Sequence, residues 1–486
     1  YEIRVCDWSS DVCSSDLALA LPLLGCSSFL DVNPKGEVFD KDMFESAEGY
    51  EDALYGIYAE LGTQKSLYSD YMFWVPETLS INVTLSDDGM SNMAIGEWSR
   101  THASTIRNDI WSAAYKVINH INNIVSHIEK GGDHEFRHTP LYKGEALALR
   151  ALLHFDMLRM YGAPIWADEA SKARAIPYVS KYSFDITAFS SLDEAYEKVI
   201  ADLKEAEKCL AEDETLVEPV RTNASDGGFT SCRIIHMNLY AVQALLARVY
   251  WSKNDLENAA VYAKKVIDSG KFGFRPVTAF NQPDNGALDL NETIFGIYST
   301  ESQKKNASKY QLDGKSTDSN FTMADDYRSL YLDGSSSSQT DYRLAAWFDE
   351  GLNTLRRLVS PTYYTSDKPS YTGKSILGIN MIRIPEMYYI MAEALLESDP
   401  DTATDYFDAV IKTRGLDALG EQGHTVTADA LYIERRKEFY GEGQQWFNMK
   451  RLGKDIVATS TITLSGSDVN TYKIPLPKNE EDNREE

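Results

Sequence analysis

The chain has 486 residues and carries 48 Lys and Arg against 74 Asp and Glu, which gives a formal net charge of −26. Hydrophobic residues make up 43% and charged residues 25%, and these proportions exclude a disordered chain, a collagen-like chain and a multi-span membrane protein. The negative charge also argues against a nucleic-acid-binding protein, because phosphate contacts require a basic surface. Tyr is the most abundant aromatic residue, and a Tyr-rich surface suits polar ligands such as sugars or peptides.

The first 25 residues differ in character from the rest of the chain. Residues 1–16 read YEIRVCDWSSDVCSSD and show no helical or strand period, so we interpret them as a non-native leader. Residues 17–25 form a short apolar run that ends in small residues, as in the remnant of a secretory signal, and this run is too short to span a bilayer. The letters LLGC at 23–26 are typical of a lipobox, which predicts that Cys26 is acylated and anchors the mature protein to a membrane.

Apolar residues recur at helical spacing through most of the remaining chain. The predicted helices occupy 40–61, 105–130, 141–160, 191–210, 238–252, 255–269, 385–397 and 402–414. Ser191 and Glu194 form a capping-box pattern, and Trp111 lies on the apolar stripe of its helix, so we expect Trp111 in the core. The helices form about four pairs, and the pair at 238–269 matches the tetratricopeptide spacing of about 34 residues. We therefore predict a mainly α fold with a tetratricopeptide-like helical repeat scaffold around one continuous core.

Two long segments do not show the repeat pattern. Residues 61–105 and 271–384 are rich in Ser, Gly, Asp, Asn, Tyr and Trp, and loops of such length are usually functional. Short strand-like pieces occur at 293–298 and 380–384. We predict a single domain over 26–486, in which about 26–270 consists mostly of helix pairs. The remaining part, about 271–486, is then a long irregular loop-rich lobe with the last helix pairs.

Catalytic and metal-binding motifs are absent from the sequence. There is no HExxH, GxSxG, P-loop or dinucleotide-type Gly cluster. His134 and His138 are four residues apart in a Gly-rich loop, where solvated histidines are more common than a metal site. The acids between 399 and 405 do not fit an EF-hand, because Thr404 and Val410 stand at its sixth and twelfth positions; a capped helix start explains them better. We predict no catalytic residues, no metal, no cofactor and no enzymatic activity.

Once the leader with Cys6 and Cys13 is set aside and Cys26 is lipidated, two of the five cysteines remain, namely Cys209 and Cys232. An exported protein sits in an oxidising compartment, so a disulfide between them is one reading. Two separate buried thiols are the reading that we favour.

Several ordered motifs distinguish this chain. Residues 433–451 read IERRKEFYGEGQQWFNMKR, residues 383–394 read RIPEMYYIMAEA before Arg414-Gly415, and residues 149–162 contain a third motif. Together with the lipobox, the letters FLD at 29–31 and YKIPLP at 472–477, they resemble the SusD/RagB family of nutrient-binding outer-membrane lipoproteins. The first stretch is similar to the family pattern ERR-x-E-F-x-x-EG-x-RW-F-D-L-x-R, with Gln445 in the Arg position before Trp446 and Asn448 in the Asp position. The resemblance spans nearly all of 26–486.

The charged residues of this motif allow two readings. Glu434, Arg435, Glu438, Glu442 and Arg451 could form a catalytic carboxylate cluster. We favour an architectural role, in which ion pairs between residues three or four apart on a helix fix the C-terminal lobe on the repeats.

The resemblance implies a binding protein on the outer-membrane surface. Such a protein captures an oligosaccharide, or less often a peptide, and delivers it to a SusC-like TonB-dependent transporter. Aromatic rings would stack on sugar faces while polar groups bond the hydroxyls, and the family draws these aromatics from two loop regions. The candidate ligand-binding residues are Trp74, Asp88, Asn92, Trp98 and Arg100 in the first loop, with Tyr310 and Tyr327 in the second.

Three hypotheses about function therefore stay open. The protein is a glycan-capturing lipoprotein, a peptide-capturing relative on the same scaffold, or a helical-repeat adaptor or unrecognised hydrolase. The acidic charge favours neutral or cationic ligands over polyanions. Binding of polysaccharides in an affinity gel separates the first hypothesis from the second, and co-purification with a large barrel argues against a soluble adaptor.

Overall fold

The computed structural model describes residues 40–85, 88–131, 136–219, 228–281, 286–310, 321–332, 340–351, 353–359 and 376–482. The predicted leader, the signal remnant and Cys26 lie outside the described residues, as does His134. Contacts divide the chain into two units, Tyr1–Met43 and Phe44–Glu486. In the described part of the first unit there is the short helix α1 (Asp40–Met43), and all elements considered below belong to the second unit.

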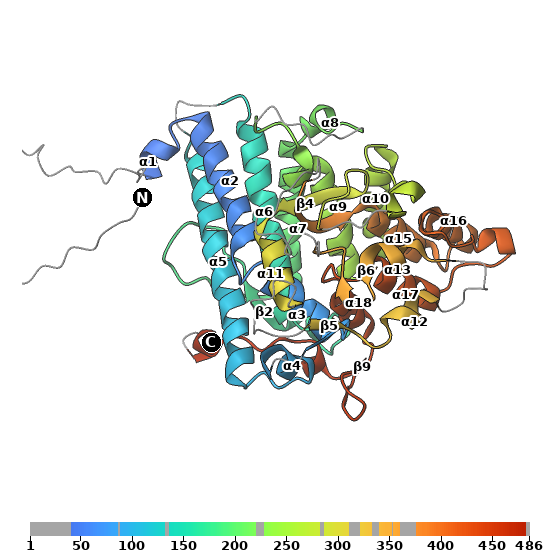
Figure 1. The fold of residues 1–486 in the computed structure, drawn as a ribbon. Coiled ribbons are helices and arrows are strands. Elements are labelled where there is room, and N and C mark those ends of the chain that lie inside the picture. Colours follow the sequence, from blue (N-terminus) through green and yellow to red (C-terminus); the bar gives the residue numbers. More distant parts are fainter. Residues whose placement is uncertain are drawn as a thin grey trace, which may run out of the picture. The chain divides into compact units, whose positions relative to one another are not determined.

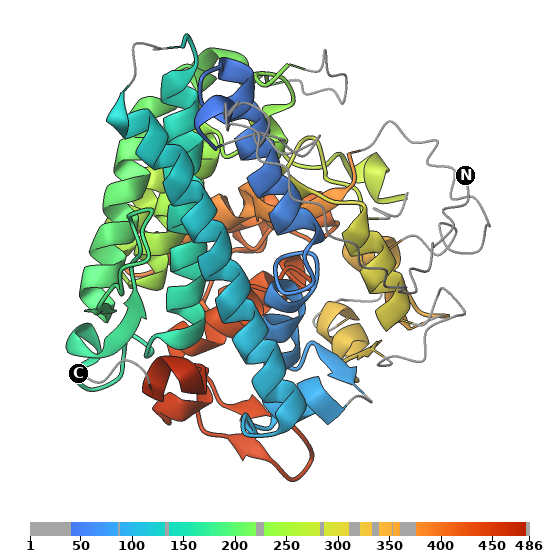
Figure 2. The same ribbon diagram turned by 90° about the vertical axis from the view of Figure 1, so that its left-hand side faces the viewer.

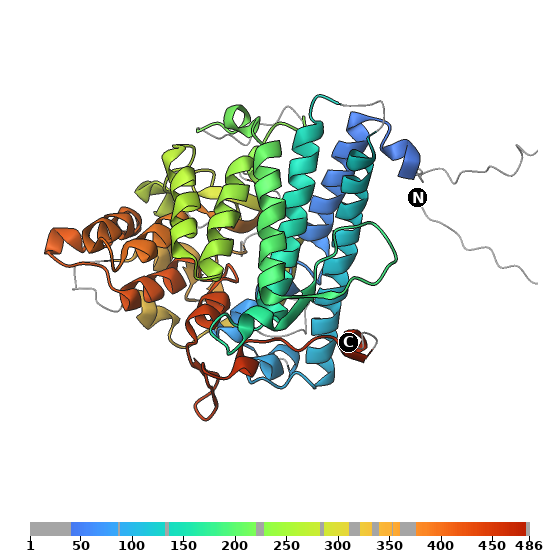
Figure 3. The ribbon, with the colours of Figure 1, turned by 180° about the vertical axis from the view of Figure 1, so that it is seen from behind.

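Most of the second unit is helical, which confirms the predicted mainly α fold (Figure 1). The main helices are α2 (Ala47–Thr63), α5 (Thr101–Lys130), α6 (Thr139–Tyr161), α7 (Leu192–Cys209), α9 (Leu239–Ser252), α10 (Leu256–Asp268), α15 (Ile384–Leu395) and α16 (Pro400–Ile411). From α5 onward each of these helices packs against the next, and Figure 3 shows them as a row. The pairs α2–α5, α6–α7, α9–α10 and α15–α16 correspond to the predicted helix pairs, and their stacking agrees with a tetratricopeptide-like arrangement.

Local capping residues explain where these helices begin. Ser191 and Glu194 form both hydrogen bonds of the predicted capping box at the start of α7. Asp399 accepts a hydrogen bond from the backbone N–H of Thr402 and caps α16, which confirms that helix capping explains the acids near 400. Helix α5 begins four residues before the predicted position 105, at Thr101.

The remaining helices are short and come mostly from the predicted irregular regions. They are α3 (Tyr71–Leu79), α4 (Asp88–Ala94), α8 (Asp213–Leu216), α11 (Glu301–Lys309), α12 (Tyr327–Leu332), α13 (Tyr342–Trp347), α17 (Ala428–Glu438), α18 (Gln445–Leu452) and α19 (Lys478–Asp482). In Figure 2 the long helices α5 to α7 lie at the left, and the yellow and orange elements α11 to α13 lie at the right.

The described strands pair two by two into antiparallel ladders. The pairs are β1 (Val83–Leu85) with β5 (Phe321–Met323), β2 (Arg174–Pro177) with β3 (Phe189–Ser191), β4 (Thr293–Tyr298) with β8 (Gly378–Arg383), β6 (Phe348–Asp349) with β7 (Thr354–Leu355), and β9 (Ile456–Val457) with β10 (Thr463–Leu464). The two strands predicted at 293–298 and 380–384 are confirmed, and they pair with each other as β4 and β8.

The core is centred on α6, which α2, α5, α7 and α9 surround. Nearly every side chain from 141 to 161 is buried as a result, including charged residues that need partners inside the protein. Trp111 on α5 is 4% exposed and packs against Tyr115 and Tyr161, which confirms its predicted core position.

Cys209 and Cys232 are both free and only partly buried, which confirms two separate thiols. In the part of the chain that the structure describes, no helix combines the length and the apolar character needed to cross a membrane.

Candidate functional site

The first predicted ligand loop is largely ordered, and Trp74 lies inside it rather than on its surface. The sequence YMFWVPETL forms α3, and every residue of this helix is buried. The indole N–H of Trp74 donates to Oδ1 of Asn306 at 3.0 Å, and its ring meets Tyr310 and Phe321 edge-on. The ring is 0% exposed and offers no face to a ligand, so the predicted stacking role of Trp74 is wrong in this structure.

Tyr310 is buried in the same way as Trp74. It follows α11 directly, is 5% exposed, and its ring lies 5.9 Å from the Trp74 ring centroid. Both rings fill the junction of α3, α11 and β5, because burying large aromatic surfaces there stabilises the fold more than solvent exposure would. The prediction that Tyr310 contacts ligand is therefore also corrected to a core position.

Three other predicted residues gather around the turn that joins α4 to α5. Asn92 and Trp98 are half-buried and Arg100 is exposed. The carbonyl of Asn92 accepts a hydrogen bond from the backbone N–H of Glu97, and the Arg100 Nε donates to a carboxylate oxygen of Glu97 at 2.7 Å. We call residues 92–100 the α4–α5 turn. It combines a partly open indole with amide and guanidinium groups, which is a suitable set for a polar ligand with apolar faces.

Asp88 begins α4, and its side chain is outside the described residues. Tyr327 begins α12, where its half-buried ring stacks on Phe348 with centroids 4.9 Å apart and an angle of 22° between the rings. One face of Tyr327 is thus covered by protein. Phe348 was not among the predicted residues, and its contact joins residues 21 positions apart, which periodicity does not reveal.

The structure joins the two predicted loop regions without bringing all seven residues together. Strand β1 follows α3, and β5 precedes α12, so their antiparallel pairing links the two regions directly. Arg436 adds a second link because its guanidinium bonds both Asn82 and Asp326. The two regions therefore lie next to each other, although Trp74 and Tyr310 are buried in the core.

The charged motif at 434–451 forms a buried network. Glu438 is 0% exposed, and its carboxylate meets the guanidinium groups of Arg343 at 3.0 Å, Arg383 at 2.6 Å and Arg414 at 2.8 Å. Burial disfavours the charged form, but Arg414 and Arg383 outweigh it and hold the pKa of Glu438 well below its usual range. A carboxylate held charged in this way is a structural anchor and a poor general acid.

The partners of this motif differ from the predicted ones. Lys437 and Glu434 form a pair three residues apart at 3.7 Å, but most other ion pairs in the motif reach distant parts of the chain. Arg451 pairs with Glu393 on α15, and the Arg435 guanidinium lies 4.2 Å from the ring centroid of Trp251 on α9. The architectural reading holds, because these contacts attach the C-terminal helices to the repeats, but the prediction of pairs within one helix is wrong.

The two departures from the family pattern leave polar groups without full bonding. Gln445 donates to the hydroxyl of Tyr432 at 3.0 Å. Asn448 is 3% exposed, and among the described residues its amide has no hydrogen-bond partner. An unbonded buried amide costs about 1–3 kcal/mol, so this part of α18 is less stable than its packing alone suggests.

A pocket between α3, α6 and residues 442–447 contains paired charges. Arg159 pairs with Asp156, and Arg248 bonds both carboxylate oxygens of Glu386 and the carbonyl of Met381. These groups are already engaged with one another. Among the described residues, no group of three or more His, Cys, Asp or Glu side chains is placed to hold a metal ion; His138 instead lies 3.1 Å from a carboxylate oxygen of Glu212.

Stacked helix pairs joined by buried ion pairs, with partly open aromatic residues in surface turns, define a helical-repeat scaffold protein. A family model described as starch-binding associating with outer membrane matches residues 28–226. A second model, described as SusD family, matches residues 336–486, so that the two together cover well over half of the chain. The chain belongs to the SusD/RagB family.

Known proteins with related sequences carry the same description. A SusD-like protein of Bacteroides ovatus is 22% identical and aligns with 88% of this chain and 80% of its own length. A SusD-like protein P38 of Formosa agariphila is 23% identical and aligns with 89% of each chain.

Solved structures share the fold. A SusD superfamily protein of Bacteroides thetaiotaomicron has a TM-score of 0.70 at 21% identity and covers 90% of this chain and 97% of its own. Surface glycan-binding protein A of Bacteroides uniformis has a TM-score of 0.67 at 18% identity, with 90% and 98% covered. A structure described as containing a xylogluco-oligosaccharide has a TM-score of 0.57 at 15% identity, with 82% of each chain covered.

Proposed function

We propose that this protein captures oligosaccharides at the cell surface and delivers them to a SusC-like TonB-dependent transporter in the outer membrane. Acyl chains on Cys26 hold it there, and residues 26–486 act as one SusD-like domain. The observation that carries the proposal is the match of residues 28–226 to the family described as starch-binding associating with outer membrane. The shared fold with a surface glycan-binding protein and with a xylogluco-oligosaccharide complex supports the same ligand class.

Within this proposal the α4–α5 turn contacts the glycan. The indole of Trp98 is half-buried and retains exposed surface, which a sugar ring can cover with its apolar face. Asn92 and Arg100 supply an amide and a guanidinium beside it, and Asp88 belongs to the same stretch of α4. The exposed Arg100–Glu97 pair is weak in water, so it can exchange its partner for a ligand hydroxyl at little cost. Tyr327 contributes from the second region through the exposed part of its half-buried ring.

Affinity electrophoresis against a panel of polysaccharides tests the proposal. Wild-type protein should be retarded by at least one glycan, and Trp98→Ala should weaken binding about tenfold or more, as expected for the loss of a central aromatic contact. Trp98→Phe is the matched control, because it keeps a stacking ring, and it should retain most of the affinity. Unchanged binding by Trp98→Ala with an unchanged melting temperature Tm would show that the glycan binds elsewhere.

The anchor and the partner need separate measurements. Cys26→Ala should move the protein from the membrane fraction to the soluble fraction, because a soluble domain without acyl chains has no anchor. Detergent extracts of the native cells should yield a large outer-membrane barrel together with the wild-type protein. Retention on peptides but on no polysaccharide would instead favour the peptide-capturing relative.

A further inference from the structure

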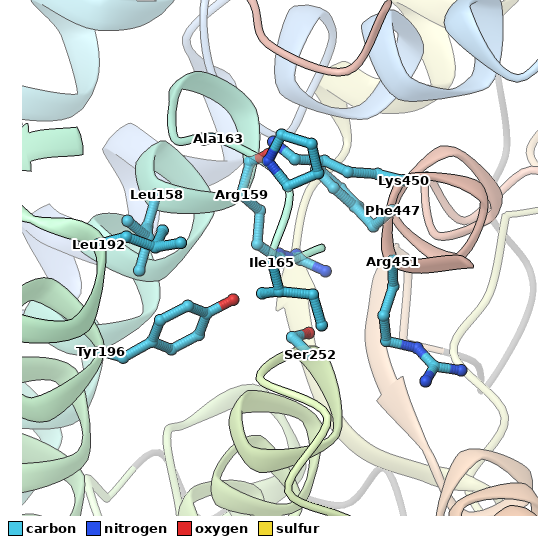
Figure 4. A pocket seen from close by; sticks show the side chains of 11 residues that line it. Leu158, Arg159, Ala163, Ile165, Leu192, Tyr196, Ser252, Phe447, Lys450 and Arg451 are labelled. Carbon is cyan, nitrogen blue, oxygen red and sulfur yellow. The ribbon is translucent and has the colours of Figure 1, made fainter. Parts of the chain in front are cut away.

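A second pocket lies where the C-terminal end of α6 meets α7, α9 and α18. Figure 4 shows the eleven side chains that line it. Its polar groups come from Arg159, Tyr196, Ser252, Lys450 and Arg451, and its remaining walls are apolar. The pocket is small, with room for about two water-sized groups. None of its lining residues belongs to the α4–α5 turn.

Every side-chain polar group that lines this pocket can donate a hydrogen bond, and none is a carboxylate or an amide. Tyr196 is 5% exposed and Ser252 is 8% exposed. Figure 4 shows the Tyr196 hydroxyl pointing away from its helix toward Ile165 and Arg159. Among the described residues, the buried Nε of Arg159 has no hydrogen-bond partner. An unbonded buried donor is costly, so an acceptor beside this Nε would stabilise the protein.

The charges around the pocket are not balanced. Arg159 pairs with Asp156, and Arg451 turns toward Glu393, so these two guanidinium groups have counter-charges outside the pocket. Lys450 is 7% exposed, and its Nζ donates to the carbonyls of Arg159 at 2.6 Å and Gly162 at 2.7 Å. No carboxylate among the described residues forms an ion pair with it. When protonated, Lys450 is therefore a buried ammonium that no carboxylate balances; its Nζ also lies 5.5 Å from the ring centroid of Trp446.

An uncompensated buried charge is unfavourable, and the protein must either lose the proton or acquire a counter-ion. Burial, together with Lys473 and Arg159, holds the pKa of Lys450 well below its usual range. An anion beside Lys450 would reverse this effect by favouring the charged form. The site that could hold it is the adjacent pocket, whose polar side chains are donors.

We propose that this pocket binds a small monovalent anion, either a halide or a compact carboxylate, which Tyr196, Ser252, Arg159 and Lys450 surround. The charge of Lys450 selects an anion over a neutral molecule, and the size of the pocket excludes a large one. Because its walls come from α6, α7, α9 and α18, the bound anion would tighten the contact of the C-terminal helices with the helix pairs.

Bromide and formate serve as probes of the full chain. Thermal unfolding is followed as bromide replaces gluconate at constant ionic strength, because gluconate is too large to enter. The Tm should rise with bromide and level off, since a ligand that binds only the folded protein stabilises it by mass action. Tyr196→Phe removes one donor without emptying space and should raise the bromide concentration at half-effect roughly tenfold. Tyr388 is a half-buried tyrosine on α15 outside the pocket. Tyr388→Phe is therefore the matched control and should leave the bromide concentration at half-effect unchanged.

Crystals grown with bromide provide a direct reading that does not depend on any variant. An anomalous peak beside Lys450 and Arg159 is expected. Formate in place of bromide tests the carboxylate class: a response to either probe supports the site and names its class. Equal Tm values in bromide, formate and gluconate would overturn the proposal, and so would crystals grown with bromide and with formate that show neither anion in the pocket.

Discussion

Replacement of Glu438 by Gln tests whether the charged motif at 434–451 anchors the C-terminal helices. Three guanidinium groups converge on this carboxylate from Arg343, Arg383 and Arg414, and all four residues are almost completely buried. Glu438→Gln keeps the shape of the side chain and removes its charge. Breaking a buried ion pair by neutralising one partner usually costs about 3–5 kcal/mol, because the other charge is left buried without a partner.

The expected magnitude for Glu438→Gln lies at the lower end of that range. Arg343 keeps its pair with Asp341, and both Arg383 and Arg414 keep Glu292. We therefore expect a loss of about 3 kcal/mol in the free energy of unfolding, which most folded proteins survive. The contribution of Glu438 follows from its depressed pKa: it is fully present above the pKa of an unfolded carboxyl and is lost as the pH falls toward the folded pKa.

Urea-induced unfolding with linear extrapolation measures this loss for the wild type and the variant. Glu421→Gln is the matched control, because the Glu421 carboxylate pairs with Lys412 on the surface and both side chains are more than half exposed. It should change the free energy of unfolding by less than about 0.5 kcal/mol. A loss below about 1 kcal/mol for Glu438→Gln, or one equal to that of the control, would refute the reasoning that this network anchors the C-terminal helices.

Three further outcomes follow from buried groups. Burial raises the pKa of Glu77 to about 7, so the contribution of this carboxyl to stability is present below the unfolded pKa of 4.5 and about 3 kcal/mol of it is lost by pH 7. Glu77→Gln should therefore reduce the fall of the urea midpoint between these pH values. A pH profile equal to that of the wild type would count against this prediction. Restoring the family pattern with Gln445→Arg and Asn448→Asp together should stabilise the protein by at least about 0.5 kcal/mol more than the two single changes summed, as a double-mutant cycle would show; additivity would mean that the two side chains do not interact. Trp74→Ala should cost about 3–5 kcal/mol in unfolding free energy because Trp74 is fully buried; a smaller loss accompanied by lost glycan binding would return Trp74 to the ligand site.

The elements predicted correctly are those whose signals are local in sequence. Ser191 and Glu194 are three residues apart, and Asp399 lies three residues before the N–H that it caps, so both helix starts are visible in the sequence. Trp74 could not be assigned in this way, because its partner Asn306 is 232 residues away and the Ser- and Asp-rich surroundings of α3 indicated a loop.

The candidate site was predictable only as a region. The turn near Trp98 was proposed because long irregular segments often carry function, and its role in binding stays a prediction; the structure shows that Trp98 is half-buried. The charged motif was correctly interpreted as structural, but the partners of Glu438 lie 24 to 95 residues away and no spacing rule names them. Lys450 stood at a variable position of the family pattern, so only its burial in three dimensions draws attention to it.

The contacts that hold α3 constrain the order in which parts of the protein fold. The backbone N–H of Gly443 donates to Glu77 at 2.6 Å across 366 positions, and Arg436 bonds Asn82 across 354. Contacts over such separations form late, because the chain entropy of closing the loop must be overcome first. During folding, the helices up to α10 can stack on one another while α3 still lacks these bonds. The attachment of α3 is therefore complete only after residues 436–443 have packed against it.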